Sequence, residues 1–329
     1  MRPETLVAAA VQLVVTGGQP IVNFRVRPLK VRAYRRSLFT DIPPGGHGGV
    51  ICATCWTVIP SAMSTLSLSV SASSAVGSPQ YTLLVAQHRA DVRAAQQLRY
   101  RIFAGEMGAT LRTTEPGVDI DNYDAYCDHL VVRDDHTGEI VGTYRMLPPE
   151  GARHAGRLYC EAEFLIPFLP GLRGCLVETG RSCVHPDHRT GAVINLIWAG
   201  IARYLLLTGN RWLMGCASVP LRTPGAADGT VAAGVWDTVR TRYLAPEQYR
   251  VLPRQPWHAD LAPQLARAAL PPLLRGYLRL GAWVCGPPAH DRDFGVADFL
   301  VLLELDRVDS RYLRHFLGHC VGDAAGSKT

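Results

Sequence analysis

Residues 176–200 read LVETGRSCVHPDHRTGAVINLIWAG, and this stretch decides the fold. Its first part has the apolar composition of a buried strand, and its last part, from Gly191, has that of a buried helix. A loop rich in Pro, Asp and Gly joins the two, so we expect a strand–loop–helix junction of an α/β protein. Two charges, Glu178 and Arg181, interrupt the strand, where a buried charge is costly unless it is paired.

The spacing of these two charges predicts an irregularity in the strand. Side chains alternate between the faces of a regular strand, so Glu178 and Arg181 would point in opposite directions. Gly180 lies between them, and a glycine inside a strand often marks a β-bulge. A bulge at Gly180 would return Arg181 to the face of Glu178, giving a charged pair beside a kink, as expected of a site.

The rest of the chain from Tyr81 onward continues the α/β pattern. An element rich in β-formers is followed by a helical one, then by a hairpin around a His-Thr-Gly turn, and helix and strand alternate after that. We expect a mixed central sheet flanked by helices. The expected strands lie at 81–87, 129–148 (a hairpin), 174–184, 211–219 and, as two late strands, within 281–306; the expected helices lie at 91–108 and 192–209, and 221–280 is largely helix and loop.

Length and charge divide the chain unevenly. The 329 residues are 47% hydrophobic, enough for a sizeable core. The net charge of +6 is concentrated in residues 1–79, where seven basic residues and two acids give +5, so the remaining 250 residues (27 basic, 26 acidic) are nearly neutral. No basic face for nucleic acid is implied. We expect a low-complexity, poorly ordered extension at 1–79, one domain at 80–320 and a flexible tail at 321–329.

The cysteines and apolar runs bear on location. Nine cysteines are an odd number without a disulfide framework, which favours a reducing cytoplasm. The lone C-x-x-C at Cys52 and Cys55 has no second pair to complete a zinc site, so we expect no metal. The apolar N-terminus lacks a convincing signal-peptide cleavage site, and the absence of a run of 18 apolar residues predicts no membrane span.

Arg99 is an anomalous charge in the first expected helix. At about 100° per residue, it falls in the middle of the apolar side formed by Val92, Ala95, Ile102 and Phe103. Arg99 is either a side chain that reaches the edge of the helix or a buried cation that needs a carboxylate.

An acidic loop offers such carboxylates. The segment VDIDNYDAYCD carries Asp119, Asp121, Asp124 and Asp128, interleaved with tyrosines. It is either a solvated turn or the wall of a pocket, and it lacks the spacing of an EF-hand. Arg145, near the end of the expected hairpin, is weak evidence on its own.

The segment HPDHRTGA connects the strand to the following helix. Gly191 opens that helix, where free backbone N–H groups favour anions such as phosphate, and Arg189 adds a cation. We therefore expect an anion site at this junction.

Several motifs together carry a resemblance to a known family. They are LRYRIFAGEMGA, DIDNYDAYCDHLVVRD, GEIVGTYRMLPPE, LVETGRSCVHPDHRTGAVINLIWAGIARYL, LMGCASV and the segment from PPLLRGYL to LELDRV. Over residues 80–318 the chain resembles the ornithine N-acyltransferases of ornithine-lipid synthesis. These belong to the GNAT superfamily and are similar to the acyl-homoserine-lactone (autoinducer) synthases.

The resemblance implies a fold, a donor and a site. It implies a GNAT fold whose central strands splay apart around the acyl-pantetheine arm, and acyl-carrier protein as the donor. It implies no other cofactor, and a lipid product that brings the enzyme transiently to the inner face of the membrane. The charged set around the autoinducer cleft matches Arg99, Phe103, Asp121, Asp124, Arg145, Glu178 and Arg181.

The expected reaction is attack of the ornithine α-amino group on a (3-hydroxy)acyl thioester, giving lyso-ornithine lipid. We expect Glu178 to accept the proton, with strand N–H groups around Gly180 holding the thioester oxygen. Asp121 and Asp124 would bind the cationic groups of the acceptor, and Phe103 is expected among the substrate-binding residues. Arg99, Arg145 and Arg181 would pair with these acids and hold the loop, or bind the acceptor carboxylate with two hydrogen bonds. Arg189 and Gly191 would bind the phosphopantetheine phosphate, and the arginines expected near this entrance to dock the carrier protein are Arg153, Arg157, Arg173 and Arg189.

Two alternatives stay open. Another amino acid could be the acceptor, or the chain could be an autoinducer synthase. Ala109 stands where the autoinducer enzymes carry a Trp, which disfavours the second. A non-catalytic binding module on the same scaffold would have no physical reason to keep costly charges.

Overall fold

The computed structural model describes residues 7–9, 28–30, 69–73, 80–223, 225–258 and 268–317. In this part of the chain nine strands form one mixed sheet, in the order β11-β13-β9-β8-β6-β5-β4-β3, with β12 paired to β13. The strands are β1 Val7–Ala9, β2 Pro28–Lys30, β3 Ser69–Ser73, β4 Gln80–Val85, β5 Asp128–Asp134, β6 Ile140–Leu147, β7 Phe164–Leu165, β8 Leu176–Val184, β9 Trp212–Pro220, β10 Leu252–Pro253, β11 Trp283–Val284, β12 Ala289–Asp291 and β13 Val296–Glu304.

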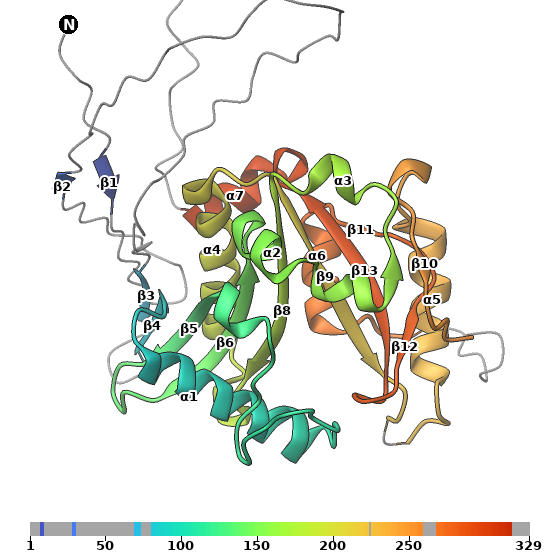
Figure 1. Ribbon diagram of the computed structural model, residues 1–329, viewed down its shortest axis with the longest axis horizontal. Helices are drawn as coiled ribbons and strands as arrows, with labels where there is room; N and C mark the ends of the chain where they lie inside the picture. The colour runs from blue at the N-terminus through green and yellow to red at the C-terminus, as the bar shows by residue number, and fades with distance from the viewer. Residues whose placement is uncertain are drawn as a thin grey trace, which may run out of the picture.

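Helices cover both faces of the sheet (Figure 1). α1 packs against β5, β6 and β8, whereas α4 packs against β3, β4 and β5, and α5 against β9. The helices are α1 Arg89–Tyr100, α2 Pro149–Ala155, α3 Leu169–Leu172, α4 Gly191–Thr208, α5 Thr230–Arg242, α6 Pro272–Arg279 and α7 Ser310–Leu317; a π-helical segment, η1, spans Arg101–Glu106, and the short 3-10 helices are η2 Asp124–Tyr126, η3 Tyr159–Ala162, η4 Pro186–His188, η5 Glu247–Tyr249 and η7 Leu305–Arg307.

The expected mixed α/β sheet is confirmed, and the main elements lie where the sequence predicts them. The differences are small elements and one boundary. β3 falls within residues 1–79, which we assigned to the extension, yet it pairs with β4 in antiparallel fashion. Apart from β1, β2 and β3, the expected extension lies outside the described residues, and so does the expected tail at 321–329.

α4 is, among the described residues, the one helix that is long and apolar enough to cross a membrane by length and composition. Half of it is buried inside the protein. Its buried positions, which include Val193, Leu196 and Tyr204, pack on the sheet in the largest apolar cluster. Gly209 ends the helix in the left-handed conformation at φ 68°, as glycine does at many helix C-termini. We interpret α4 as a core helix.

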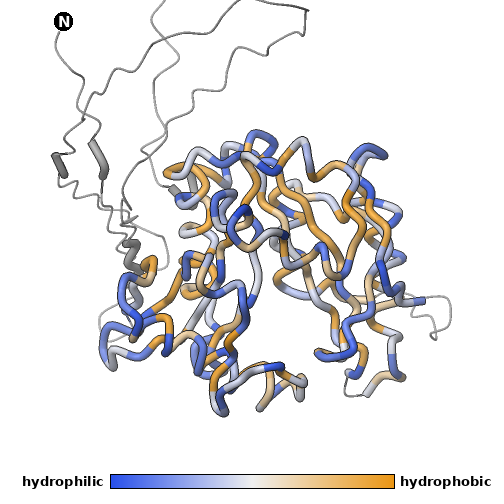
Figure 2. Tube along the Cα trace, viewed as in Figure 1, coloured by the Kyte–Doolittle hydropathy of each residue, from blue (hydrophilic) through white to orange (hydrophobic). Residues whose placement is uncertain are grey.

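The apolar core on the α1 face of the sheet is divided in two. One cluster, under α1, contains Leu98, Ile102 and Val131. The other, around the start of β8 and β9, contains Leu176 and Trp212. In Figure 2 much of the chain along the central strands has the colour of hydrophobic residues. The charged side chains that the sequence places in strands lie between these two clusters.

β8 and β9 diverge in the middle of the sheet (Figure 1). They pair in parallel only from Leu176 opposite Trp212 to Thr179 opposite Gly215. At this last pair the backbones approach so closely that a Cβ on Gly215 would lie 2.4 Å from the carbonyl oxygen of Thr179. Beyond it the strands separate.

A bulge in β8 begins where the divergence begins. Arg145 of β6 pairs with Gly180, but Thr143, two residues away, pairs with Cys183, three residues away. The extra residue therefore lies at Arg181–Ser182 on β8. Among the described non-glycine residues, Arg181 alone has a positive φ, of 52°. The predicted bulge is confirmed, but the residue in the unusual conformation is Arg181 and not Gly180.

Candidate active site

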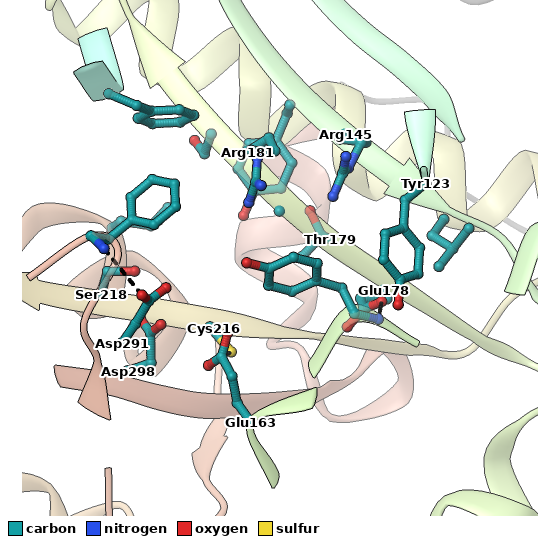
Figure 3. Close-up of a pocket in the computed structure, with 18 of the residues that line it drawn as sticks. Tyr123, Arg145, Glu163, Glu178, Thr179, Arg181, Cys216, Ser218, Asp291 and Asp298 are labelled. Carbon is teal, nitrogen blue, oxygen red and sulfur yellow. Dashed lines mark hydrogen bonds between the residues drawn. The ribbon is translucent and has the colours of Figure 1, made fainter. Parts of the chain in front are cut away.

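A cavity of about 230 Å³ lies where β8 and β9 separate. Its walls come from distant parts of the chain, because the sheet, η1, η3 and the loop before β13 all reach it (Figure 3). Residues that line it are Phe103, Tyr144, Arg145, Tyr159, Glu163, Glu178, Thr179, Gly180, Arg181, Ser182, Cys216, Ser218, Asp291, Phe294 and Asp298.

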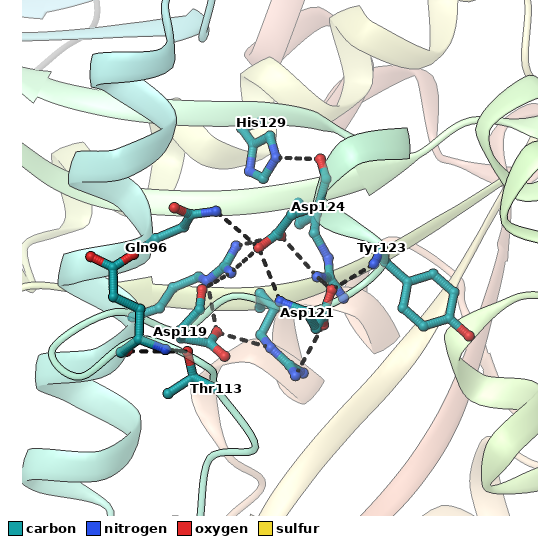
Figure 4. Close-up of polar contacts among 11 residues, drawn as sticks. Gln96, Thr113, Asp119, Asp121, Tyr123, Asp124 and His129 are labelled. Atoms are coloured by element: carbon teal, nitrogen blue, oxygen red, sulfur yellow. Dashed lines mark hydrogen bonds and ion pairs between the residues drawn. The ribbon is translucent and has the colours of Figure 1, made fainter.

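Arg99 is the buried cation that the helical pattern predicts. Its side chain is fully buried, and its Nε donates to Asp119 Oδ2 at 2.8 Å. Its Nη1 and Nη2 donate to the two carboxylate oxygens of Asp124 at 3.0 and 2.7 Å. The acidic loop is thus folded over the end of α1 (Figure 4). The alternative, an arginine that reaches the edge of the helix, is wrong.

Two further arginines complete this cluster. Arg145 Nη1 donates to Asp121 Oδ1 at 2.6 Å and to Asp124 Oδ1 at 3.0 Å. Arg181 Nε donates to Asp119 Oδ2 at 3.1 Å, and its Nη2 lies 3.2 Å from Asp121 Oδ2. Three arginines thus hold three aspartates, and the formal charges sum to zero. We call Arg99, Arg145, Arg181, Asp119, Asp121 and Asp124 the arginine–aspartate cluster.

The charges of the cluster fix its protonation. Burial acts to raise the pKa of Asp124, but hydrogen bonds from Arg99 and the charge of Arg145 outweigh it, so the pKa lies well below the usual range. For Asp121, burial is likewise outweighed by Arg145 and Arg181, and its pKa is lowered. Both aspartates are therefore ionised at neutral pH, and their charges are already balanced by arginines. Their expected role in binding the cationic groups of the acceptor stays a prediction.

Glu178 is buried and lines the cavity, but its partners are not those we expected. Its two carboxylate oxygens accept backbone N–H groups of η3, from Tyr159 at 2.6 Å and from Cys160 at 2.8 Å. Arg181 instead bonds to the acidic loop, so the expected pair between Glu178 and Arg181 is wrong. Burial raises the pKa of Glu178, against the lowering effect of these hydrogen bonds and of Arg145.

Arg181 stands at the centre of the cavity wall. Its guanidinium lies 5.0 Å from the centre of the Tyr159 ring and 5.4 Å from that of Phe294. The left-handed backbone of a non-glycine residue is strained, and such strain persists where the surroundings hold the residue in place. The aspartates and the two rings supply that support.

Phe103 lies on the π-helical turn η1, directly after α1. Its ring meets the Phe294 ring edge-on, with the centroids 5.5 Å apart, and it lines the cavity as expected. The helical pattern of the sequence did not reveal the π-helical turn, a feature found frequently at functional sites.

The expected phosphate site lies at the start of α4. Thr190 is the N-cap, Gly191 is the first helical residue, and both are exposed. Arg189 makes two hydrogen bonds to Glu106, at 2.8 and 2.6 Å. Neither Arg189 nor Gly191 lines the cavity itself. Arg173 precedes β8 and Arg189 follows it, so the expectation that both flank one entrance is wrong.

Sequence reasoning missed the acids on the opposite wall of the cavity. Glu163 precedes β7, and Asp298 lies within β13. One carboxylate oxygen of each residue and the Sγ of Cys216 on β9 all lie within 4.8 Å of one another. Cys216 Sγ donates to Glu163 Oε2 at 3.5 Å. The signal available for Asp298 was a charge inside the apolar strand VADFLVLLE, the same kind of signal that Glu178 gave.

Comparison with known proteins identifies the family. The acetyltransferase (GNAT) domain family matches residues 98–199. The L-ornithine N(alpha)-acyltransferase of Rhizobium meliloti (strain 1021) is 38% identical over 249 residues, covering 70% of this chain and 82% of the relative. The enzyme of the same name from Brucella abortus (strain 2308) is 35% identical over 252 residues, covering 70% and 87%.

A solved structure also aligns with the chain. It is the CoA-dependent acyl-homoserine lactone synthase BjaI with SAM and isopentyl-CoA, at 17% identity and a TM-score of 0.42, covering 70% of this chain and 84% of that one. The conclusion rests on the sequence relatives, whose identity and coverage extend over most of both chains. The GNAT-like fold is confirmed, the protein is an N-acyltransferase, and the chain belongs to the L-ornithine N(alpha)-acyltransferase family.

Proposed function

We propose that the protein transfers a (3-hydroxy)acyl chain from the phosphopantetheine thioester of acyl-carrier protein to the α-amino group of ornithine. The product is the lyso-ornithine lipid, and its formation is the first step of ornithine-lipid synthesis. The observation that carries the proposal is the cavity at the divergence of β8 and β9, which is lined by Glu178 and by the bulge. The names of the relatives support ornithine as the acceptor.

The reaction needs a free amine and a polarised thioester. The amine nitrogen attacks the carbonyl carbon, the C–N bond forms and the C–S bond breaks; the nitrogen gives its extra proton to the departing sulfur, so the products are the amide and the carrier thiol. The α-ammonium first gives up a proton, which we assign to Glu178, directly or through a water. Burial raises the pKa of this carboxyl, as suits a group that accepts a proton.

The bulge is the proposed position of the thioester oxygen. Gly180, Arg181 and Ser182 line the cavity at the point where β8 leaves β9. The backbone there is held by its pairing with β6 and by the ion pairs of the Arg181 side chain. Donors that are already in place stabilise the negative charge on the oxygen without reorganisation.

The donor arm would reach the cavity past the start of α4. An N-terminus of an 18-residue helix beside Arg189 suits the phosphate of phosphopantetheine. The carrier protein is acidic and would dock at this end of β8. We propose a cytoplasmic enzyme that meets the inner face of the membrane transiently, through its lipid product.

Glu178→Gln tests the base. Gln keeps the shape of Glu178 and one acceptor oxygen for the N–H groups of η3 but cannot accept the proton. Acyl transfer should therefore fall by about 10²–10⁴-fold in a variant that thermal unfolding shows to be folded. Transfer from 3-hydroxyacyl carrier protein to a panel of amino acids, read by mass spectrometry, measures this. Turnover of the variant equal to wild type across the pH range would remove Glu178 from the mechanism. Acylated homoserine lactone, or acylation of amino acids other than ornithine, would replace the proposed acceptor.

A further inference from the structure

The acids behind one wall of the cavity are balanced by arginines, whereas those that line the other side are not. The arginine–aspartate cluster holds one side, whereas Glu163 and Asp298 lie on the other with Asp291 beside them (Figure 3). We call Glu163 and Asp298 the carboxyl pair. No ion pair to a lysine or arginine is made by either member within the described residues.

Asp298 has a buried carboxylate oxygen that no protein donor satisfies in the described residues. It is only 3% exposed, it lines the cavity, and within the described part of the chain its buried Oδ1 has no hydrogen-bond partner. A buried carboxylate oxygen without a donor is unfavourable, so it is normally satisfied by a cation, a proton or a donor from a ligand. Ser218 of the neighbouring strand β9 pairs with Asp298 across the sheet. Asp298 Oδ1 nevertheless has no donor among the described residues.

The charge around the cavity is negative. Its lining holds two arginines, Arg145 and Arg181, against four acids, Glu163, Glu178, Asp291 and Asp298. Both arginines already bond to aspartates of the cluster. With all four acids ionised, the formal charge of the lining would be −2, which favours a ligand that carries positive charge.

The carboxyl pair is also unfavourable when both members are ionised. Burial raises the pKa of Glu163, and repulsion from Asp298 and Asp291 raises it further. Burial likewise raises the pKa of Asp298, with repulsion from Asp291 adding to it and a hydrogen bond with Ser218 opposing it. These raised pKa values favour a protonated member of the pair, and a bound cation would displace that proton.

We propose that Glu163 and Asp298 bind the side-chain ammonium of the acceptor and so select a diamino acid. The inference rests on the proposed function and assigns a part of the substrate to this wall. Glu178 and the bulge on β8 take the reacting α-amino group and the thioester. The carboxyl pair lies across the divergence, beyond β9, where the far end of an acceptor held at β8 would lie. The cationic side chain supplies the donor that Asp298 Oδ1 lacks.

The test compares two acceptors that differ in one charge. Norvaline has the carbon chain of ornithine without the terminal ammonium. Initial rates with 3-hydroxyacyl carrier protein give kcat and KM for ornithine and norvaline in the wild type, Glu163→Gln and Asp298→Asn. We expect Asp298→Asn to lower kcat/KM for ornithine on the order of 100-fold, through KM, because it leaves a buried ammonium poorly paired. Its effect on norvaline should be within about threefold, so the preference for ornithine collapses.

Asp134→Asn is the matched control. Asp134 is a buried carboxylate on β5 that accepts the backbone N–H of His136 and does not line the cavity. Its substitution should leave the preference between the two acceptors unchanged. Thermal unfolding of each variant shows that it is folded.

The outcomes separate the two claims. A folded Asp298→Asn and a folded Glu163→Gln that both keep the wild-type preference overturn the inference and leave ornithine acylation intact. A fall in kcat that is equal for ornithine and norvaline in these variants also overturns the inference. The carboxyl pair would then act in the acyl transfer itself and not in binding the acceptor's side-chain ammonium. A wild type that acylates norvaline as well as ornithine overturns the inference and leaves ornithine acylation intact, whereas a wild type that acylates neither overturns the proposed acceptor.

Discussion

The arginine–aspartate cluster reaches the cavity through Arg145 and Arg181, whereas the carboxyl pair lines it directly; both hold buried acids, with opposite consequences. Asp119, Asp121 and Asp124 are held by Arg99, Arg145 and Arg181, so their charges are satisfied before any ligand arrives. Glu163 and Asp298 lie beside one another without such partners, and Asp298 Oδ1 has none in the described residues. Burial of an acid alone therefore does not indicate its role. The position of its counter-charge does, because a charge balanced within the protein builds the site and an unbalanced one is left for a ligand.

Removing a counter-charge from the cluster should have the largest effect. Arg99→Met keeps the volume of the side chain and leaves Asp119 and Asp124 without their buried cation. We expect a loss of about 3–5 kcal/mol in the free energy of unfolding, because an uncompensated buried charge remains. Urea denaturation at neutral pH measures it. Arg99→Lys keeps the charge but loses the paired hydrogen bonds of the guanidinium, so its free energy of unfolding should lie between those of wild type and Arg99→Met. A loss under about 1 kcal/mol for Arg99→Met would contradict the claim that the arginine–aspartate cluster stabilises the fold.

The sequence predicts well which charged residues gather at the arginine–aspartate cluster and at Glu178. Arg99 within an apolar helical side, Glu178 and Arg181 within an apolar strand, and an acidic loop between them are local patterns, and each falls at the cavity or in the cluster. The partners were harder to assign. Glu178 bonds to the backbone of η3, 18 and 19 residues earlier in the chain, and no periodicity encodes such a contact.

The carboxyl pair escaped prediction for a physical reason. Glu163 and Asp298 are far apart in sequence, and only the pairing of β13 beside β9 brings them together. The bulge was predicted at Gly180 because glycine tolerates unusual backbone angles, yet the ion pairs of Arg181 hold that residue at a φ of 52° instead. Tertiary contacts overrode a local preference there.

Acid should weaken the cluster specifically. The pKa of Asp124 is lowered below its ordinary value, so its contribution to stability is present above the ordinary aspartate pKa of about 3.9 and is lost as the pH falls below it. Asp124→Asn should cost about 1.5–3 kcal/mol at neutral pH, since hydrogen bonds to charged groups are lost. The difference between wild type and variant should shrink as the pH falls. Urea denaturation at a series of pH values between neutral and acid checks this; a difference that is constant with pH would contradict it.

Neutralising the carboxyl pair should have the opposite and smallest effect. Because the pKa of Glu163 is raised, its contribution is most favourable below the ordinary glutamate pKa and is lost as the pH rises through the raised value. Glu163→Gln should therefore stabilise the ligand-free protein by about 1 kcal/mol at alkaline pH, with a smaller gain at acid pH. Thermal unfolding in the absence of ornithine measures the gain. A destabilised Glu163→Gln would show that the pair contributes to the fold in the same way as the cluster.

The most direct test of the contrast is a pH titration of the side-chain carboxyl carbons by NMR, with Asp124→Asn and Asp298→Asn used to assign the two signals. We expect Asp124 to titrate below the ordinary aspartate range both with and without ornithine. We expect Asp298 to titrate above that range in the protein without ornithine, and saturating ornithine, but not norvaline, to move its titration downward. An Asp298 signal that titrates in the ordinary range, or that responds equally to both amino acids, would contradict the account.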